Sequence, residues 1–161
     1  FNAWDAIIEK TGRKNLRVNM LMNRASPWAD LDSHLPYEGK VVLKMKKKMR
    51  VDLRIPGWTN KSQVTCKRNG KARDFTWQGD YIHIRGLKKG DELTVEFPMA
   101  EKTVYRDLKG KDYWMDVKGF TVVDLRPHKK ITPIFQRGHL KRDRAPSRDI
   151  QRFVSKQDFI W

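Results

Sequence analysis

Hydrophobic residues take every second position through much of residues 49–99, and this alternation is the feature that most narrows the fold of the chain. Residues 50–55 read Arg-Val-Asp-Leu-Arg-Ile, and residues 93–97 read Leu-Thr-Val-Glu-Phe. Successive side chains of a β-strand point to opposite faces of a sheet, whereas one face of a helix repeats every three or four residues. The pattern therefore predicts strands that bury one face and expose the other.

Glycine and proline separate these segments at the places where a sheet needs turns. Asn69-Gly70 favours a tight type I′ hairpin, because both residues tolerate positive φ angles. We expect Phe75 and Trp77 to lie in the strand that returns from this turn. Pro98 should end the last strand of the segment, since proline has no N–H to donate to a neighbouring strand.

Further candidate strands lie on both sides of this segment. They are residues 16–22, 40–45, 103–105, 113–117 and 119–125. Roughly nine short strands separated by turns are typical of an all-β fold. We therefore expect an antiparallel, jelly-roll-like β-sandwich over residues 13–137.

The two ends of the chain depart from this pattern. The residues Phe1, Trp4, Ile7 and Ile8 are spaced as on one face of an amphipathic helix, and Gly12 follows where a helix cap is favoured. We expect residues 1–12 to hold this short N-terminal helix, as the remnant of a preceding helical domain. Residues 138–161 are irregular and basic, which predicts a C-terminal tail anchored by Phe153, Val154, Phe159, Ile160 and Trp161.

The chain is strongly basic, with 35 Lys and Arg against 19 Asp and Glu and a formal net charge of +16. A charge of this sign suits a nucleic acid as partner. The basic residues are divided among residues 44–50, 109–118 and 126–156. We therefore favour solvated basic faces and keep a nucleic-acid-binding β domain as an alternative. No apolar run approaches the roughly 20 residues that span a bilayer, so no membrane span is expected.

Cys66 is the only cysteine of the chain. A single thiol can form neither an internal disulfide nor a multi-cysteine zinc site. Val64 and Cys66 share one face of a candidate strand. We expect Cys66 to fill a core position as a small hydrophobic residue.

Asp30, Asp32 and His34 are the best metal-ligand candidates, because their spacing places them on one strand face. The segment lacks the glycine and the closing glutamate of a calcium-binding loop, so polar groups that satisfy backbone donors are the favoured interpretation. The sequence contains neither a Gly-x-Ser-x-Gly elbow nor a His-Glu-x-x-His motif. We expect no catalysis by this chain alone.

Four aromatic residues are candidates for stacking on a sugar ring or a base, since each stands at a strand end or beside a turn. They are Trp58, Trp77, Tyr81 and Trp114. For each of them, packing in the core or over its mouth is the favoured interpretation. A carbohydrate-binding module with an aromatic platform remains the alternative.

A series of motifs occurs in a specific order and spacing. It comprises Leu-Arg-Ile-Pro-Gly-Trp at 53–58, Asn-Gly at 69–70, Gly-Asp-Tyr-Ile at 79–82, Lys-Gly-Asp at 89–91 and Phe-Pro-Met at 97–99, with flanking pieces at 18–28, 35–39, 121–124 and 133–137. With these motifs the chain resembles the C-terminal β-sandwich region of family 127 glycoside hydrolases, the β-L-arabinofuranosidase-like enzymes. The resemblance extends from about Leu16 to Trp161.

The resemblance implies that the catalytic machinery lies outside this chain. Members of that family carry an (α/α) barrel ahead of the sandwich, with a zinc-bound cysteine nucleophile, further Cys and Glu ligands, and a Glu acid/base. Cys66 does not match that cysteine-pair context, so zinc is expected only in the missing barrel. The chain also lacks an initiator methionine, which fits a start inside a longer protein.

The resemblance thus predicts a non-catalytic β-sandwich module of a bacterial glycoside hydrolase, in the cytoplasm or the periplasm. Its main expected partner is the missing barrel of the same polypeptide. A homo-oligomer and a carbohydrate are further partners that fit this interpretation, whereas a nucleic acid is disfavoured.

Overall fold

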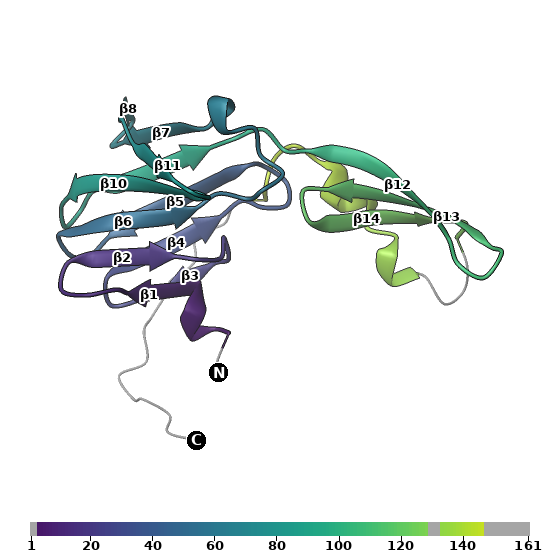
Figure 1. Ribbon diagram of the computed structural model, residues 1–161, viewed down its shortest axis with the longest axis horizontal. Helices are drawn as coiled ribbons and strands as arrows, with labels where there is room; N and C mark the ends of the chain where they lie inside the picture. The colour runs from purple at the N-terminus through teal and green to yellow at the C-terminus, as the bar shows by residue number, and fades with distance from the viewer. Residues whose placement is uncertain (1–2, 129–132, 147–161) are drawn as a thin grey trace, which may run out of the picture.

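The computed structural model describes residues 3–128 and 133–146, and these residues form three β-sheets (Figure 1). Two sheets pack face to face as a sandwich, and the third projects from one end of it. The expected all-β sandwich is confirmed, and no helix among the described residues is long and apolar enough to cross a membrane.

The two sheets of the sandwich have five and six strands. The first contains, in spatial order, β1 (Ile8–Lys10), β2 (Asn15–Val18), β6 (Met49–Arg54), β10 (Tyr81–Leu87) and β9 (Thr76–Gln78). The second contains β3 (Arg24–Ala25), β4 (Ala29–Ser33), β5 (Lys40–Met45), β11 (Glu92–Glu96), β7 (Thr65–Arg68) and β8 (Lys71–Ala72). The chain therefore crosses between the sheets repeatedly, for example from β5 to β6 and from β10 to β11.

The core lies between these sheets and follows the alternation of the sequence. In β6, Val51 and Leu53 are fully buried while Arg50 and Arg54 are exposed. In the second sheet, Leu93 lies opposite Leu43 across the β5–β11 pair. Burial of each such aliphatic side chain contributes about 1.5–3 kcal/mol. Cys66 lies in this core on β7, as expected for a small hydrophobic residue.

Two details of the sandwich correct the expectations from sequence. The N-terminal amphipathic helix is only a 3₁₀ turn, η1 (Asp5–Ile7), and Ile8 already belongs to β1. Pairing with β2 gives the backbone of β1 hydrogen-bond partners, and Ile7 and Ile8 are both buried. A helix as short as the expected one would be unstable by itself. The first sheet is also not wholly antiparallel, since β2 and β6 pair in parallel.

The turn at Asn69-Gly70 is confirmed, with φ angles of 51° and 77°. It joins β7 to β8, so the returning strand is Lys71–Ala72 rather than a strand through Phe75 and Trp77. Trp77 instead lies on β9, at the edge of the other sheet. The returning strand is short because the chain leaves the second sheet after Ala72, which the alternation alone does not reveal.

The third sheet consists of β12 (Glu101–Asp107), β13 (Asp112–Lys118) and β14 (Thr121–Arg126). Short 3₁₀ turns occur at η2 (Lys61–Gln63), η3 (Pro133–Phe135) and η4 (Gly138–Lys141). The last two pack beside the third sheet (Figure 1). The expected tail anchors Phe153, Val154, Phe159, Ile160 and Trp161 lie outside the described residues.

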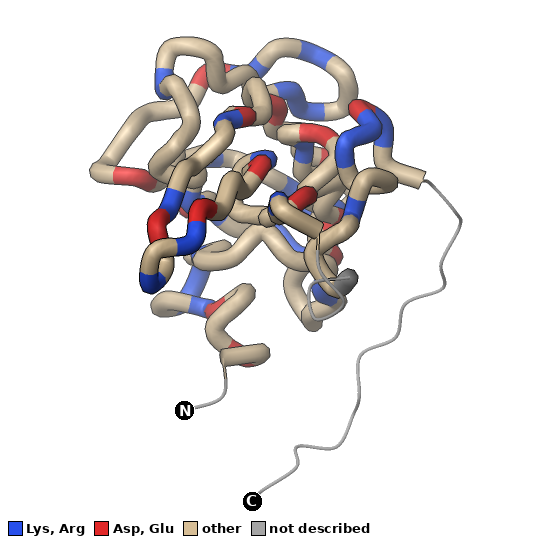
Figure 2. The backbone as a smooth tube through the Cα atoms, turned by 90° about the vertical axis from the view of Figure 1, so that its right-hand side faces the viewer, with Lys and Arg blue, Asp and Glu red and all other residues tan. Residues whose placement is uncertain are grey.

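Lys and Arg are distributed over the strands and loops of the described backbone, with Asp and Glu between them (Figure 2). Several of the acidic residues form ion pairs with them, such as Lys46 with Asp30 at 2.6 Å and Lys67 with Glu96 at 2.7 Å. The positive charge is therefore partly neutralised locally.

Candidate functional site

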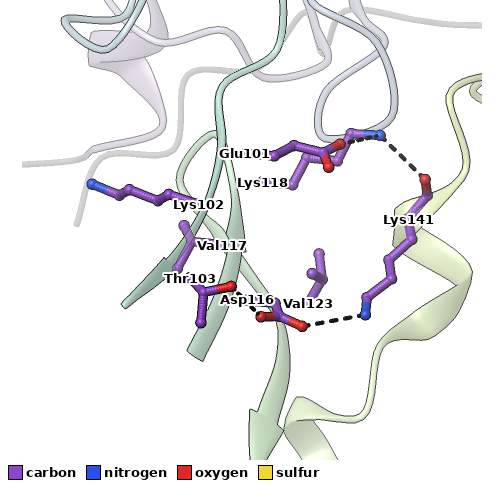
Figure 3. Close-up of a pocket in the computed structure, with 8 residues that line it drawn as sticks. All are labelled: Glu101, Lys102, Thr103, Asp116, Val117, Lys118, Val123 and Lys141. Atoms are coloured by element: carbon purple, nitrogen blue, oxygen red, sulfur yellow. Dashed lines mark hydrogen bonds and ion pairs between the residues drawn. The ribbon is translucent and has the colours of Figure 1, made fainter. Parts of the chain in front are cut away.

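A polar cavity of about 400 Å³ lies on one face of the third sheet (Figure 3). Strand β12 contributes Glu101 and Thr103, β13 contributes Asp116 and Lys118, and η4 contributes Lys141. The register of the sheet pairs Thr103 with Asp116 and Glu101 with Lys118, so these side chains share one face.

Asp116 is the central acceptor of this cavity. Its Oδ1 accepts hydrogen bonds from Thr103 Oγ1 at 2.8 Å and from Arg126 Nη2 at 2.9 Å, and its Oδ2 lies 3.4 Å from Lys141 Nζ. The bond from Thr103 and the charges of Arg126 and Lys141 outweigh partial burial and hold the pKa of Asp116 below its usual range. This group is therefore an ionised acceptor at neutral pH.

Lys118 closes the other end of the cavity and holds the segment after η4 against the sheet. Its Nζ donates to Asp143 Oδ1 at 2.9 Å and to the carbonyl of Arg142 at 3.0 Å, and lies 3.4 Å from Glu101 Oε1. The side chain is fully buried, and these acceptors replace the water that its ammonium group loses.

Of the aromatic candidates, Trp58 has a structural position at the junction between the sandwich and the third sheet. Its ring makes edge contacts with Phe97 and Phe120, at centroid distances of 5.8 and 5.7 Å. Gly119 packs directly on it, since a Cβ at Gly119 would lie 3.0 Å from the Trp58 ring. Only part of this ring is open to solvent.

Trp77 and Tyr81 point to opposite faces of the first sheet. Trp77 pairs with the buried Ile82, packs against the core and contacts Phe75 at 5.8 Å. Tyr81 lies on the outer face, where its hydroxyl donates to Asn19 Oδ1 at 2.8 Å and Arg17 covers its ring. The four aromatic candidates therefore form no common platform.

Trp114 differs from the other three because it is exposed. It pairs across the third sheet with Tyr105, which is also exposed, and the ring centroids are 5.7 Å apart. Sequence reasoning missed Tyr105, since its position opposite Trp114 depends on the register of β12 and β13. The alternation in residues 103–105 is the only sequence signal that pointed to this strand.

A second hollow, of about 360 Å³, is mainly apolar and lies where the sandwich meets the third sheet. Residues 19–22 and 54–57 line it together with Leu35 and Phe120. Met22 and Phe120 are exposed at its rim, and Phe120 is 75% exposed. We call this hollow the apolar groove. Exposed contiguous apolar surface of this kind is typical of interaction sites.

The metal-ligand candidates Asp30, Asp32 and His34 each face a different partner. Lys46 Nζ lies 2.6 Å from Asp30, Lys44 Nζ lies 3.5 Å from Asp32, and Glu38 Oε1 lies 3.6 Å from His34. Throughout the described residues, no three His, Cys, Asp or Glu side chains are grouped so as to hold a metal ion.

The donor set for the zinc that the family resemblance implies is also lacking in the described part of the chain. Cys66 is buried, and burial raises the pKa of its thiol to about 11, against a lowering contribution from Arg73. A zinc ligand has to be a thiolate, so this neutral core thiol does not fit that role. A zinc site in a catalytic domain stays a prediction.

The outer face of the first sheet carries a cluster that sequence reasoning did not single out. Asp52 is largely buried; its Oδ1 lies 2.5 Å from His83 Nδ1, and its Oδ2 accepts from Asn15 Nδ2 at 2.6 Å. His83 Nε2 is buried without a hydrogen-bond partner among the described residues. The pairing of β6 with β10 creates this contact between residues 31 positions apart.

Comparison with known proteins places the sandwich in a family. A family model described as "Beta-L-arabinofuranosidase, GH127 middle domain" matches residues 14–99, which is more than half of the chain. This range coincides with the sandwich apart from β1. No curated protein sequence matches the chain.

Solved structures support the same fold. A GH127 β-L-arabinofuranosidase from Geobacillus stearothermophilus T6 is 21% identical, with a TM-score of 0.51, over 72% of this chain and 21% of that chain. A structure described as a glycoside hydrolase is 17% identical, with a TM-score of 0.51, over 66% of this chain and 20% of that chain. The chain thus spans about a fifth of the length of these proteins.

Proposed function

Because the chain belongs to the GH127 β-L-arabinofuranosidase family through its middle domain, we propose that it is a non-catalytic β-sandwich module that packs against the catalytic barrel of a glycoside hydrolase. The module would supply a rigid surface that supports the barrel, and the barrel would carry the zinc and the acid/base group. The apolar groove is the observation that carries this proposal.

The groove is built from the segments that carry the family resemblance. Residues 19–22 and 54–57 belong to the motif runs 18–28 and 53–58, and Leu35 begins the run 35–39. Exposed apolar side chains such as Met22 leave unfavourable contacts with water that a packed neighbour would remove. A domain of the same polypeptide is the natural neighbour, since the chain spans only a fifth of its structural relatives.

Binding between separately produced parts tests this packing. The catalytic barrel of a GH127 β-L-arabinofuranosidase and this chain would be purified separately and mixed in a calorimeter. We expect specific binding that Phe120→Ser and Met22→Ser each weaken about tenfold, an effect of the size found for removing one anchor of an interface. Leu108→Ser is the matched control, because Leu108 is also exposed but lies outside the groove. Absence of binding, or equal loss in the control, would overturn the proposal.

The non-catalytic role has its own test. We expect this chain alone to release no nitrophenol from p-nitrophenyl β-L-arabinofuranoside, and we expect activity to require the barrel. Turnover by the chain alone, in gel-filtration fractions where the activity co-elutes with the protein peak, would show that the chain holds a complete active site.

Support of oligomerisation is the second part of the proposal. With the barrel absent, two copies of this chain can cover each other's apolar groove, because a twofold-symmetric dimer uses the same surface of both copies. Light scattering should then show a dimer that Phe120→Ser converts to a monomer. A monomeric wild-type chain at millimolar concentration would remove this part of the proposal and leave barrel packing to be judged separately.

A further inference from the structure

We propose that the third sheet carries a saccharide-binding site, formed by the Tyr105–Trp114 ring pair and the polar cavity beside it. The sugar would stack on the rings and place its hydroxyls against Asp116 and its neighbours. This proposal concerns a different surface from the apolar groove, so either can fail without the other.

Both rings of the pair are exposed to solvent, whereas large aromatic side chains in a sheet are usually buried. Tyr105 is 50% exposed and Trp114 is 40% exposed, and the register of β12 and β13 places them directly opposite each other. Their planes are inclined by 54°, so the pair forms an open corner rather than a flat platform. One ring can therefore lie against the apolar face of a sugar while the other covers its edge.

Tyr105 is held in place before any ligand binds. Its hydroxyl donates to Asp112 Oδ1 at 2.5 Å, and this bond, together with the carboxylate charge, raises the pKa of Tyr105. The ring is thus neutral and fixed at one end. A preorganised ring loses less conformational entropy on binding than a free one.

Hydrogen-bonding groups continue from the rings on the same face. Thr103 and Asp116 occupy the next row of the sheet, two residues from Tyr105 and Trp114, and Arg126 lies opposite Trp114 on β14. Thr103, Asp116 and Lys141 point into the cavity in Figure 3. Carboxylate, hydroxyl and ammonium groups together can accept from and donate to the vicinal hydroxyls of a sugar.

The signs of these charges favour a neutral saccharide over a nucleic acid. Asp112, Asp116 and Asp124 all belong to this face, and the neighbouring cations Arg126 and Lys141 already pair with Asp116, which makes them less available to a phosphate. A protein partner would be expected to meet an apolar centre with polar groups at the rim, whereas here charged groups adjoin the rings directly. A site with stacked rings and a few fixed polar groups is the usual form of a small-ligand pocket.

Affinity electrophoresis of the full chain tests the site, with soluble arabinan, arabinogalactan and hydroxyethylcellulose as probes. We expect at least one polysaccharide to retard the wild type, and Trp114→Ala and Tyr105→Ala each to weaken binding about tenfold or more, the loss found when a stacking ring is removed. Asp116→Asn should weaken it several-fold. Leu108→Ser is the matched control, since Leu108 is exposed in the turn between β12 and β13 and lines neither the polar cavity nor the apolar groove, and it should bind as the wild type does.

Folding of each variant would be checked by its thermal transition. If Trp114→Ala fails to fold, the wild type with ¹⁵N-labelled indoles gives an independent readout, because the bound sugar should shift the Trp114 signal more than the other five. Absence of retardation by all three polysaccharides, or equal retardation of the folded Trp114→Ala variant, would overturn the proposal. Salt-sensitive binding of an oligonucleotide that requires Trp114, without polysaccharide binding, would also overturn it.

Discussion

Lys118 and Asp143 form an ion pair of 2.9 Å in which only the lysine is buried, since their side chains are 2% and 93% exposed. The buried ammonium group also binds the carbonyls of Lys141 and Arg142. A single side chain from β13 thus fixes a segment about 25 residues later in the chain. The two ends of this contact should respond very differently to substitution.

We predict that Lys118→Met lowers the free energy of unfolding by about 1–3 kcal/mol, because charge-assisted hydrogen bonds from a buried donor are lost. Asp143→Asn should have little effect, because its carboxylate is already solvated. Urea unfolding measures both, and hydrogen exchange should show faster exchange at residues 138–146 in Lys118→Met alone. Equal destabilisation by the two variants would contradict this asymmetry.

The thiol of Cys66 should be unreactive in the native protein. Burial raises its pKa to about 11 from the ordinary value of 9.0, so it stays protonated at pH 8. A thiol-disulfide indicator should therefore react fully only after denaturation. Because the unfolded chain releases this proton at lower pH than the folded chain, the free energy of unfolding should fall as pH rises from about 9 to about 11. Cys66→Ala should remove that part of the pH dependence.

Asp91 should stabilise the turn before β11 through its negative charge. Burial opposes this charge, but hydrogen bonds from the backbone N–H of Lys88, from Asn69 and from Arg68 outweigh it and hold the pKa of Asp91 below its usual range. The stabilisation is therefore present above the unfolded pKa of about 4 and is lost as pH falls through the lower folded value.

We predict that Asp91→Asn lowers the free energy of unfolding at pH 7 by about 1.5–3 kcal/mol, as for hydrogen bonds to a charged group. Chemical unfolding at pH 7 and pH 3 measures the change. The difference between variant and wild type should shrink at the lower pH, because pH 3 lies below the unfolded pKa of Asp91 and part of the charge-dependent stabilisation is then lost. A difference that is the same at both pH values would show that the charge is not what matters.

Gly39 should tolerate no side chain. A Cβ there would lie 1.9 Å from the carbonyl oxygen of Phe97, and the Gly39 carbonyl accepts a hydrogen bond from Phe97 N–H at 2.8 Å. Gly39→Ala must therefore displace backbone, and we predict a loss of about 3 kcal/mol or more. Gly57→Ala is the matched control, because nothing lies within 4 Å of its Cβ and the loss should be small. Thermal unfolding of the two variants checks the difference.

Alternation and turn residues were sufficient to predict the sandwich and several of its strands. Residues 40–45 form β5 as expected, and Asn69-Gly70 forms the expected turn, because both depend on local preferences. The path of residues 71–78 was wrong because the change of sheet after Ala72 is set by tertiary packing. The prediction of an N-terminal helix was wrong because the spacing of apolar residues does not reveal that Ile8 pairs with Val18 on β2.

The candidate sites depended still more on register. Trp114 could be named from sequence because it lies beside a turn, but Tyr105 could not be joined to it before the β12–β13 pairing was known. The same holds for Asp52 and His83, which are unremarkable outward residues until β6 and β10 pair. A sequence thus shows which face a side chain occupies more readily than which other side chain it meets.

The repeated crossing of the chain between the two sheets has a consequence for how the protein reaches its native state. The first sheet needs β2, β6 and β10, whose pairing joins residues separated by 27 to 38 positions. Each layer takes strands from distant parts of residues 8–96, so early hairpins gain little by themselves. Chains rich in such distant contacts fold slowly and as a unit. A ribosome would therefore have to release the sequence through β10 before the first layer could be complete, and through β11 before the second could be.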